Sequence, residues 1–279
     1  MIYYKKRFGI KTADIFHDNT EKPDRKVDVW SYFFVAKREN FRSNSVCSIL
    51  LDLSKTEEEL FSNFSKTTKY QINRAKKKDG IICATVYEPG NHNVSVLNDF
   101  LDFFNAFAMS KGLPSLSMRN LEQYIEMNTL YIRSASKDNE VLAMHLYDVS
   151  NNLAWLQRSC SLFRKNNDPT HKSLIGRANR LLHWEDCLFF KQKNLLEYNF
   201  GGFYTGNIDK ELLMLNEFKD SFGGELKTLY SYMIPISPKG YVLIILRFLR
   251  FHIEQVLHFF KKFKLIIFKE KEKKNEDID

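Results

Sequence analysis

Two glycine pairs, each following a phenylalanine, are the first candidates for a functional site. One ends Tyr198-Asn199-Phe200-Gly201-Gly202 and the other is Gly223-Gly224. Residues 195–200 form a short apolar and aromatic run, which predicts a buried strand that stops at a glycine turn. Glycine accepts positive φ and lets a ligand approach the backbone closely, so Gly201 and Gly202 are candidate substrate-binding residues. Ordinary turn chemistry explains the same glycines equally well.

Three side chains are candidates for moving a proton: His145, His171 and Tyr198. Histidine is the commonest general acid or base in enzymes, and tyrosine also serves. A single histidine in a strand, as expected for His145, is more often a packed residue than a catalyst. The three are therefore hypotheses for a catalytic role, and proton removal by water or by the substrate itself is the alternative.

Four further residues are candidate ligands for a charged substrate: Tyr70, Arg74, Gln157 and Arg158. An arginine beside a strand end, as expected for Arg158, can bind a phosphate or carboxylate through its planar fork of donors. Tyr70 and Arg74 belong to a basic segment that could meet the phosphates of a substrate. The alternatives are a surface arginine and a basic helix end that complements the helix dipole.

Hydrophobic periodicity and turn signals predict the elements that must position these residues. Asp168-Pro169-Thr170 supplies the start signals of a long helix over 172–191. We expect residues 1–26 to be a lead-in with one short strand, and 238–240 to be a hinge. Strands are predicted over 27–36, 45–53, 81–87, 130–136, 141–149, 153–162, 195–200 and 225–235, and helices over 54–78, 94–110, 118–127, 172–191 and 209–222.

This order of elements and motifs resembles the GNAT-like acyltransferases of the Fem type, which build peptidoglycan cross-bridges, and their single-domain relatives in envelope polysaccharide clusters. In that family a strand ends in a Tyr-Asp-Phe-Gly-Gly-like turn, and the next helix closes with Phe-Lys-x-x-Phe-Gly-Gly. The matches here are residues 198–202 and Phe218-Lys219-Asp220-Ser221-Phe222-Gly223-Gly224, with Asn199 in place of the usual acid. The basic segment Ser65 to Lys77 also fits the pattern. The resemblance covers about residues 27–235.

The resemblance implies an α/β fold, α+β in detail. We expect one GNAT-like domain over 27–237, with a mixed, largely antiparallel central sheet and flanking helices, and a C-terminal helical tail over 238–279. It also implies that Lys219 binds substrate. The segment 164–171 contains no glycine, whereas ordinary GNAT enzymes place there a glycine-rich loop that holds the pyrophosphate of coenzyme A.

The function implied by the resemblance is an N-acyltransferase. It would move an acyl or aminoacyl group onto an amine of a cell-envelope precursor, such as a nucleotide- or lipid-linked sugar of peptidoglycan or polysaccharide. We expect no permanently bound cofactor and no metal. The donor substrate would be acyl-CoA or aminoacyl-tRNA, and tRNA is a partner in the second case.

The composition favours a cytoplasmic location but does not identify a substrate. The 279 residues carry a net charge of +8, which suits an anionic partner or simply a lysine-rich surface in water. The four cysteines are scattered, with no spacing typical of disulfide frameworks or zinc sites, as expected in a reducing cytoplasm. The first residues lack the long apolar core of a signal peptide.

Residues 241–268 differ in character from the rest of the chain. Arginine and lysine occupy one side of the predicted helix, while phenylalanine, leucine and isoleucine occupy most of the other. Such a basic amphipathic helix suits the inner face of a membrane, although packing on the same domain or on a second subunit fits equally. No apolar run approaches the roughly 20 residues of a spanning helix. We therefore expect a cytoplasmic protein, peripheral on the inner membrane.

Two other functional classes remain open. The chain could be a non-enzymatic, membrane-associated binding protein with a degenerate GNAT-like domain, which the missing glycine-rich loop favours. It could also bind RNA through the basic helix alone, although Tyr70 is the one aromatic residue there that could stack on a base.

Overall fold

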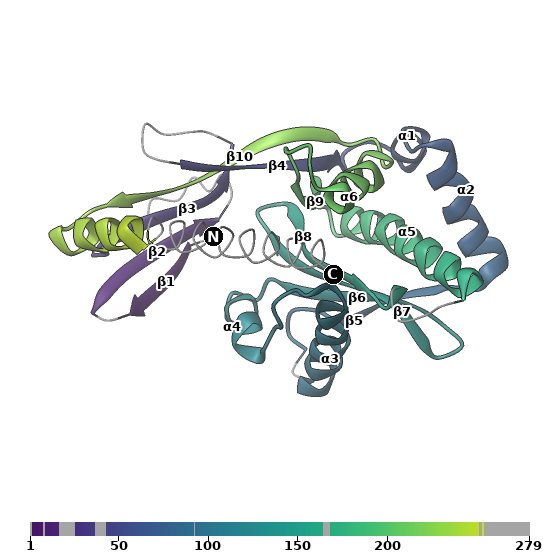
Figure 1. Ribbon diagram of the computed structural model, residues 1–279, viewed down its shortest axis with the longest axis horizontal. Coiled ribbons are helices and arrows are strands. Elements are labelled where there is room, and N and C mark those ends of the chain that lie inside the picture. The colour runs from purple at the N-terminus through teal and green to yellow at the C-terminus, as the bar shows by residue number, and fades with distance from the viewer. Residues whose placement is uncertain are drawn as a thin grey trace, which may run out of the picture. The chain divides into compact units, whose positions relative to one another are not determined.

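The computed structural model describes residues 2–7, 9–16, 26–36, 43–91, 93–163, 168–250 and 253 (Figure 1). The chain divides into two compact units, which are described separately. Unit 1 comprises residues 1–44 and 230–279, and unit 2 comprises residues 45–229. Two strands, β4 (Ser43–Asp52) and β10 (Glu225–Pro235), belong to both. Within the described residues the strands form a mixed, largely antiparallel sheet of ten strands, so the predicted α/β class is confirmed.

Unit 1 contains three strands and the second half of β10. The three are β1 (Ile2–Arg7), β2 (Ile10–Phe16) and β3 (Val29–Val35). β1 pairs with β2 and β3 with β10 in antiparallel fashion, whereas β2 and β3 are parallel. The sequence predicted one short strand in the lead-in, but β1 and β2 form a hairpin around Gly9, whose φ is +76°.

A helix over 238–250 follows β10, so the predicted hinge at 238–240 is wrong. Pro238 stands in the first turn, where a missing N–H costs no helical hydrogen bond. Gly240 lies within this helix, and close packing requires glycine there because a Cβ would collide with the Asp28 carbonyl oxygen. Within the described residues, no helix is both long and apolar enough to cross a membrane. The predicted tail 241–268 lies largely outside the described residues.

The sheet of unit 2 has the order β10-β4-β9-β8-β7-β6-β5. All neighbours whose registers are resolved pair antiparallel except β8 and β9, which are parallel. Their pairing covers only Leu153 to Trp155 against Glu197 to Asn199, so the ladder stops early. The remaining strands are β5 (Ile82–Tyr87), β6 (Leu130–Lys137), β7 (Glu140–Ser150), β8 (Leu153–Ser161) and β9 (Glu197–Phe203).

The predicted helix over 54–78 is interrupted. The hydroxyl of Ser65 accepts a hydrogen bond from the backbone N–H of Thr68 at 3.2 Å and so begins a new helix, with Phe64 buried at the break. The other predicted helices are confirmed. The helices are α1 (Glu57–Ser62), α2 (Lys66–Arg74), a π-helical turn η1 (Ala75–Asp79), α3 (Val94–Lys111), α4 (Met118–Glu126), α5 (Pro169–Gln192) and α6 (Lys210–Asp220).

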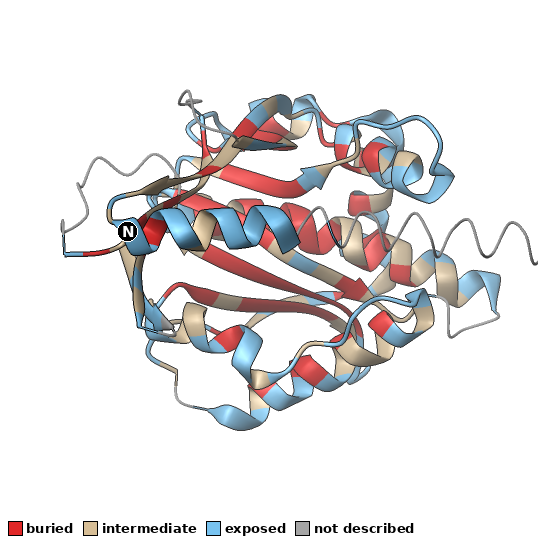
Figure 2. Ribbon diagram, turned by 60° about the vertical axis from the view of Figure 1, so that its left-hand side comes forward, coloured by how far each residue is buried: buried red, intermediate tan, exposed pale blue. Residues whose placement is uncertain are grey.

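Unit 2 has a hydrophobic core on each face of its sheet. Ala143 and Tyr147 of β7 pack on the side of α5, while Met144 and Leu146 pack on the side of α3 and α4 (Figure 1). This is the period-two alternation of a strand. β7 is buried over most of its length, as the red strands of Figure 2 illustrate. On β6 and β7, the polar side chains that lie on the same face of the sheet as Tyr147 are therefore next to α5.

Strand β9 does not end at the glycine pair, contrary to the sequence prediction. It continues to Phe203 because β4 supplies hydrogen-bonding partners that far. Phe200 and Gly201 together oppose Ile49, which makes a β-bulge with Gly201 at φ +76°. Gly202 does not have a positive φ.

Gly223 is required by close packing as well as by its φ of +68°. A Cβ there would lie 2.5 Å from the carbonyl oxygen of Asn63. Gly112, with φ +64°, has nothing within 4 Å of the same position. We expect Gly112→Ala to lose about 1–2 kcal/mol of stability from the left-handed backbone alone. Gly223→Ala should lose about 1–3 kcal/mol more because the backbone must also shift.

Urea denaturation of the two variants tests this difference. Equal losses would show that the contact with Asn63 relaxes without cost.

Candidate active site

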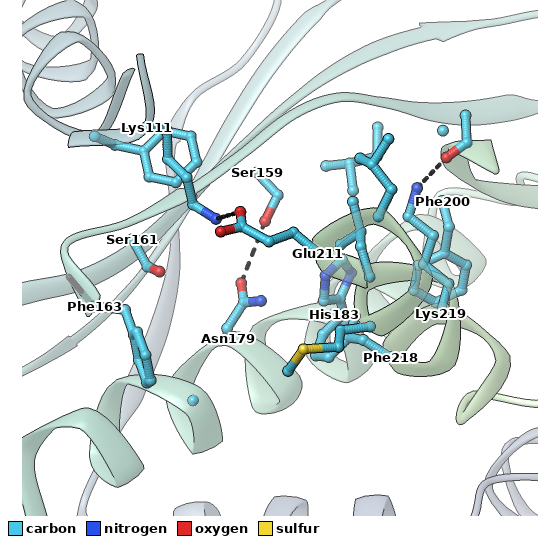
Figure 3. Close-up of a pocket in the computed structure, with 18 of the residues that line it drawn as sticks. Lys111, Ser159, Ser161, Phe163, Asn179, His183, Phe200, Glu211, Phe218 and Lys219 are labelled. Atoms are coloured by element: carbon cyan, nitrogen blue, oxygen red, sulfur yellow. Dashed lines mark hydrogen bonds and ion pairs between the residues drawn. The ribbon is translucent and has the colours of Figure 1, made fainter. Parts of the chain in front are cut away.

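A cavity of about 820 Å³ in unit 2 lies where the β8–β9 ladder stops (Figure 3). Its walls come from β8, β9, α5, α6 and the end of α3. This volume is in the usual range of small-molecule sites. The pairing of the two parallel strands ends at Trp155 and Asn199, so residues that follow on each strand line a cavity instead of continuing the ladder.

The cavity brings together four of the residues predicted to bind substrate: Gln157, Gly201, Gly202 and Lys219. Gly201 lies where a Cβ would be 2.9 Å from the Leu156 carbonyl oxygen, so β8 and β9 still approach each other closely at this point. The glycine pair thus exposes backbone to the cavity at the place where the strands separate.

The other predicted residues lie outside the cavity lining. Tyr70 is 62% exposed on α2, and the Arg74 guanidinium lies 3.8 Å from Asp79. Arg158 is exposed and donates a hydrogen bond to the Gln157 carbonyl at 2.6 Å. His171, in the first turn of α5, has its Nε2 3.0 Å from Glu140. His145 and Tyr198 are buried behind the cavity. The roles of these residues stay predictions.

Lys219 is a buried cation at the cavity wall. Lys219 lies in the third turn of α6, and its Nζ donates a hydrogen bond to the carbonyl of Gly202. Burial lowers the pKa of Lys219 to about 8. The ammonium is therefore mostly charged at neutral pH and stands directly beside the glycine pair.

His183 is the residue that sequence reasoning missed. It lies on α5 one turn after Asn179, and both side chains line the cavity (Figure 3). Its pKa is held well below the usual 6.5, first by burial and then by the positive charges of His145, Lys219 and Arg180. His183 is therefore a neutral imidazole at physiological pH.

The tautomer of His183 follows from its hydrogen-bond chain. Its Nδ1 lies 2.7 Å from the Tyr198 hydroxyl, which lies 2.8 Å from that of Tyr147. Tyr147 donates to Asp186 at 2.5 Å, so its oxygen accepts from Tyr198. The Tyr198 oxygen must then accept from Nδ1–H of His183. Burial raises the pKa of both tyrosines, so both keep their protons.

The lone pair of His183 is consequently on Nε2. Among the described residues this nitrogen has no hydrogen-bond partner, while the ring lines the cavity. A neutral imidazole in this state can accept a proton from a bound substrate.

Asp186 anchors this chain and a second one. Its carboxylate accepts from Nε of Arg133 and lies 2.8 Å from Nδ1 of His145. The Nε2 of His145 lies 2.8 Å from the amide oxygen of Asn179, which lines the cavity. Asp186 is fully buried, and a buried carboxylate is tolerated only when it is paired and hydrogen-bonded. Two hydrogen-bonded chains thus lead from one carboxylate to the cavity.

Comparison with known proteins shows the fold and no more. No family model matches the chain, and no curated protein matches its sequence. Among solved structures, FemX has a TM-score of 0.60 at 10% identity, over 84% of each chain. The C-terminal domain of a putative lysylphosphatidylglycerol synthetase from Agrobacterium fabrum has a TM-score of 0.54 at 12% identity, over 88% of this chain and 83% of that one.

A third structure, L-PGS from Bacillus licheniformis, has a TM-score of 0.51 at 11% identity, over 88% of this chain and 84% of the other. These likenesses agree with the observed sheet and flanking helices. The chain therefore has the GNAT-like fold that its sequence predicts.

The lowered pKa of Lys219 predicts a specific dependence of stability on pH. Between about 8 and the ordinary value of 10.5, the unfolded chain binds a proton that the folded chain does not. Stability therefore rises with pH in this window. Relative to Lys219→Met, the wild type should gain stability from pH 8 to 10.5, by an amount on the order of 1–3 kcal/mol.

Chemical denaturation at several pH values measures the free energy of unfolding of the two proteins. The contributions of the other lysines cancel in the difference between them. A constant difference across the window would show that Lys219 is solvated.

Proposed function

We propose that the protein is an N-acyltransferase that moves an acyl or aminoacyl group onto an amine of a cell-envelope precursor. The observation that carries this proposal is the unprotonated Nε2 of His183 in the same cavity as the Lys219 ammonium and the Gly201-Gly202 backbone. Acyl transfer to an amine needs a proton acceptor and a cation or N–H group for the developing oxyanion. The fold shared with FemX and with lysylphosphatidylglycerol synthetases supports the class of reaction.

The proposed reaction begins with an amine and an activated carbonyl held together in the cavity. The amine nitrogen attacks the carbonyl carbon, and Nε2 of His183 takes the proton that the nitrogen loses. Lys219 stabilises the negative charge that develops on the carbonyl oxygen. The bond to the thiol or hydroxyl of the donor then breaks, and the proton returns to that leaving group. No covalent enzyme intermediate is needed, because positioning and electrostatics supply the catalysis.

The donor is acyl-CoA or aminoacyl-tRNA, and the acceptor is an amine on a nucleotide- or lipid-linked sugar. Two exposed residues of the basic helix α2, Tyr70 and Arg74, together with the half-buried Lys69, would contact tRNA or nucleotide phosphates outside the cavity. Arg158 would serve the same purpose beside Gln157. Thermal-shift screening with coenzyme A, acyl-CoA and charged tRNA separates the two donor classes.

A second proposal concerns location. The helix over 238–250 exposes apolar side chains to solvent, among them Tyr241, Val242, Ile245, Leu246 and Leu249. With the basic residues predicted along the same segment, this surface suits the anionic inner face of a membrane. The protein would then act at the cytoplasmic face, near a lipid-linked acceptor. If transfer is absent, membrane binding by the same helix favours the non-enzymatic alternative.

The first prediction from this proposal concerns His183. We expect His183→Gln to lower kcat by about 10²–10⁴-fold while the protein stays folded, because a general base contributes on that order. For the wild type, kcat/KM should fall on the acid side at a pH well below 6.5, where His183 gains a proton. It should also fall above about pH 8, where Lys219 loses its charge.

Steady-state kinetics with the donor found by screening measure how kcat/KM falls at low pH and at high pH. His171→Gln, a change of the same kind on the same helix but outside the cavity, discriminates between the two histidines. Loss of activity in His171→Gln together with normal activity in His183→Gln would refute the assignment of His183.

The membrane proposal predicts that the full chain co-sediments with anionic liposomes and that high salt weakens the binding. A chain ending at Lys239 should lose most of this binding, because it lacks the exposed apolar residues and the basic tail. Neutral liposomes are the control. Equal binding of both chains, or no preference for anionic lipid, would leave the helix as a contact between protein surfaces.

A further inference from the structure

We propose that Arg180 forms an anion-binding subsite of the cavity, and that the substrate of the proposed transfer presents a phosphate or carboxylate to it. The proposal rests on the function proposed above for its link to catalysis. The binding of an anion is a separate property that can be measured without any transfer.

The primary observation is that Arg180 has no counter-ion. In the part of the chain that the structure describes, its guanidinium makes no hydrogen bond and no ion pair, and its Nε is buried without a partner. The two arginines of unit 2 that are buried among the described residues each have a carboxylate partner. Arg177, on the same helix, lies 2.5 Å from Asp79, and Arg133 is bonded to Asp186. Half-buried donors without partners are costly, so a ligand that supplies the acceptors is the direct explanation.

The guanidinium also lies near the proposed reacting groups. It lies over the ring of Phe218 at 4.7 Å, and Phe218 directly precedes Lys219 on α6. The charges of Arg180 and Lys219 both lower the pKa of His183, so all three groups are close together. Burial lowers the pKa of Arg180, yet an arginine keeps its proton at any physiological pH. The anion would therefore bind within reach of the proposed proton acceptor.

The carboxylates of the cavity do not serve as partners. Asp209 and Glu211 line its wall, but neither forms an ion pair with Arg180 in the described structure. Glu211 instead lies 3.3 Å from Lys111 of α3 (Figure 3). The fork of Arg180 donors thus remains available for a ligand.

Gly176 leaves space for an anion beside the Arg180 guanidinium. It lies one turn before Arg180 on the same face of α5 and lines the same cavity. A Cβ there would meet nothing within 4 Å, so no packing contact requires glycine. Glycine inside a helix costs roughly 0.5–1 kcal/mol relative to alanine. The missing side chain leaves room beside the guanidinium for a group the size of a phosphate or carboxylate.

The chemistry of the site selects the ligand class. A guanidinium binds carboxylates and phosphates through two parallel N–H···O bonds, and the contact with the Phe218 ring supports the side chain of Arg180 from one side. Arg180 lies in the fourth turn of α5, so the proposed subsite is separate from the N-terminus of that helix. The anion could be a phosphate of a nucleotide- or lipid-linked substrate, or the carboxylate of an amino acid or peptide.

The test uses inorganic phosphate, pyrophosphate, acetate and malonate as probes, titrated at constant ionic strength with chloride as the reference. Affinities are measured by calorimetry and by thermal shift for the wild type, Arg180→Gln and Arg119→Gln. Arg119 is an exposed arginine of α4 outside the cavity, so its change to glutamine is the matched control. We expect Arg180→Gln to weaken binding of the preferred probe about tenfold or more, and Arg119→Gln to leave it unchanged.

Without a probe, the Tm of Arg180→Gln should equal or exceed that of the wild type, because an unpaired buried charge is removed. Gly176→Leu is a second variant that should block the site while keeping Arg180. A preference for phosphates identifies a phosphate-bearing substrate, and a preference for carboxylates identifies an amino acid or peptide.

Equal binding by wild type and Arg180→Gln, or no binding of any probe to the wild type, would overturn the subsite. Loss of anion binding in Arg180→Gln together with no transfer by the wild type would instead reject the proposed function and keep the subsite.

Discussion

The buried carboxylate of Asp186 is the interaction on which the candidate site depends. It joins three elements that are far apart in sequence: Arg133 from β6, His145 and Tyr147 from β7, and its own helix α5. A charge in such a place is stable only because these three donor groups converge on it, while Arg133 also donates a hydrogen bond to the Thr85 hydroxyl at 2.5 Å. The same contacts fix the rotation of α5 about its axis. That rotation decides that Asn179 and His183 face the cavity rather than the core.

The cavity itself results from a constraint in the sheet. β8 and β9 pair over three residues and then separate, whereas β9 stays paired with β4 and has a bulge at Gly201 in that pairing. Ser48 donates to the Gly201 carbonyl at 2.6 Å, and the Asn199 amide oxygen accepts from Gly201 N–H at 2.7 Å. Asn199 occupies the position at which the family that the sequence resembles has an acidic residue, and here its side chain stabilises the local backbone. It closes the bulge that exposes the glycine backbone.

Much of the fold could be predicted from the sequence, because its signals are local. Periodicity, the Asp168-Pro169 start and the turns of the central strands identify most helices and strands at nearly their observed limits. The cavity residues Gly201, Gly202 and Lys219 could be predicted because they belong to sequence motifs that mark a turn and a helix end. His183 could not be found this way, since it lies in an apolar helical stripe that reads as core. Its partners Tyr198 and Tyr147 meet it only through the register of β7, β8 and β9, which no local pattern encodes.

The division of the chain has a consequence for the order of folding. β3 and β10 of unit 1 are partners, and the Phe34 N–H donates to Ser231, 197 residues further along the chain. Most of the residues between them belong to unit 2, which comprises residues 45–229. At synthesis rates of about 5–20 residues per second, β3 waits roughly 10 to 40 s for its neighbour. Unit 2 can complete its sheet in that time, except for the edge that β10 supplies. The exposed edge of β3 is thus the part of the nascent chain most in need of protection from foreign strands.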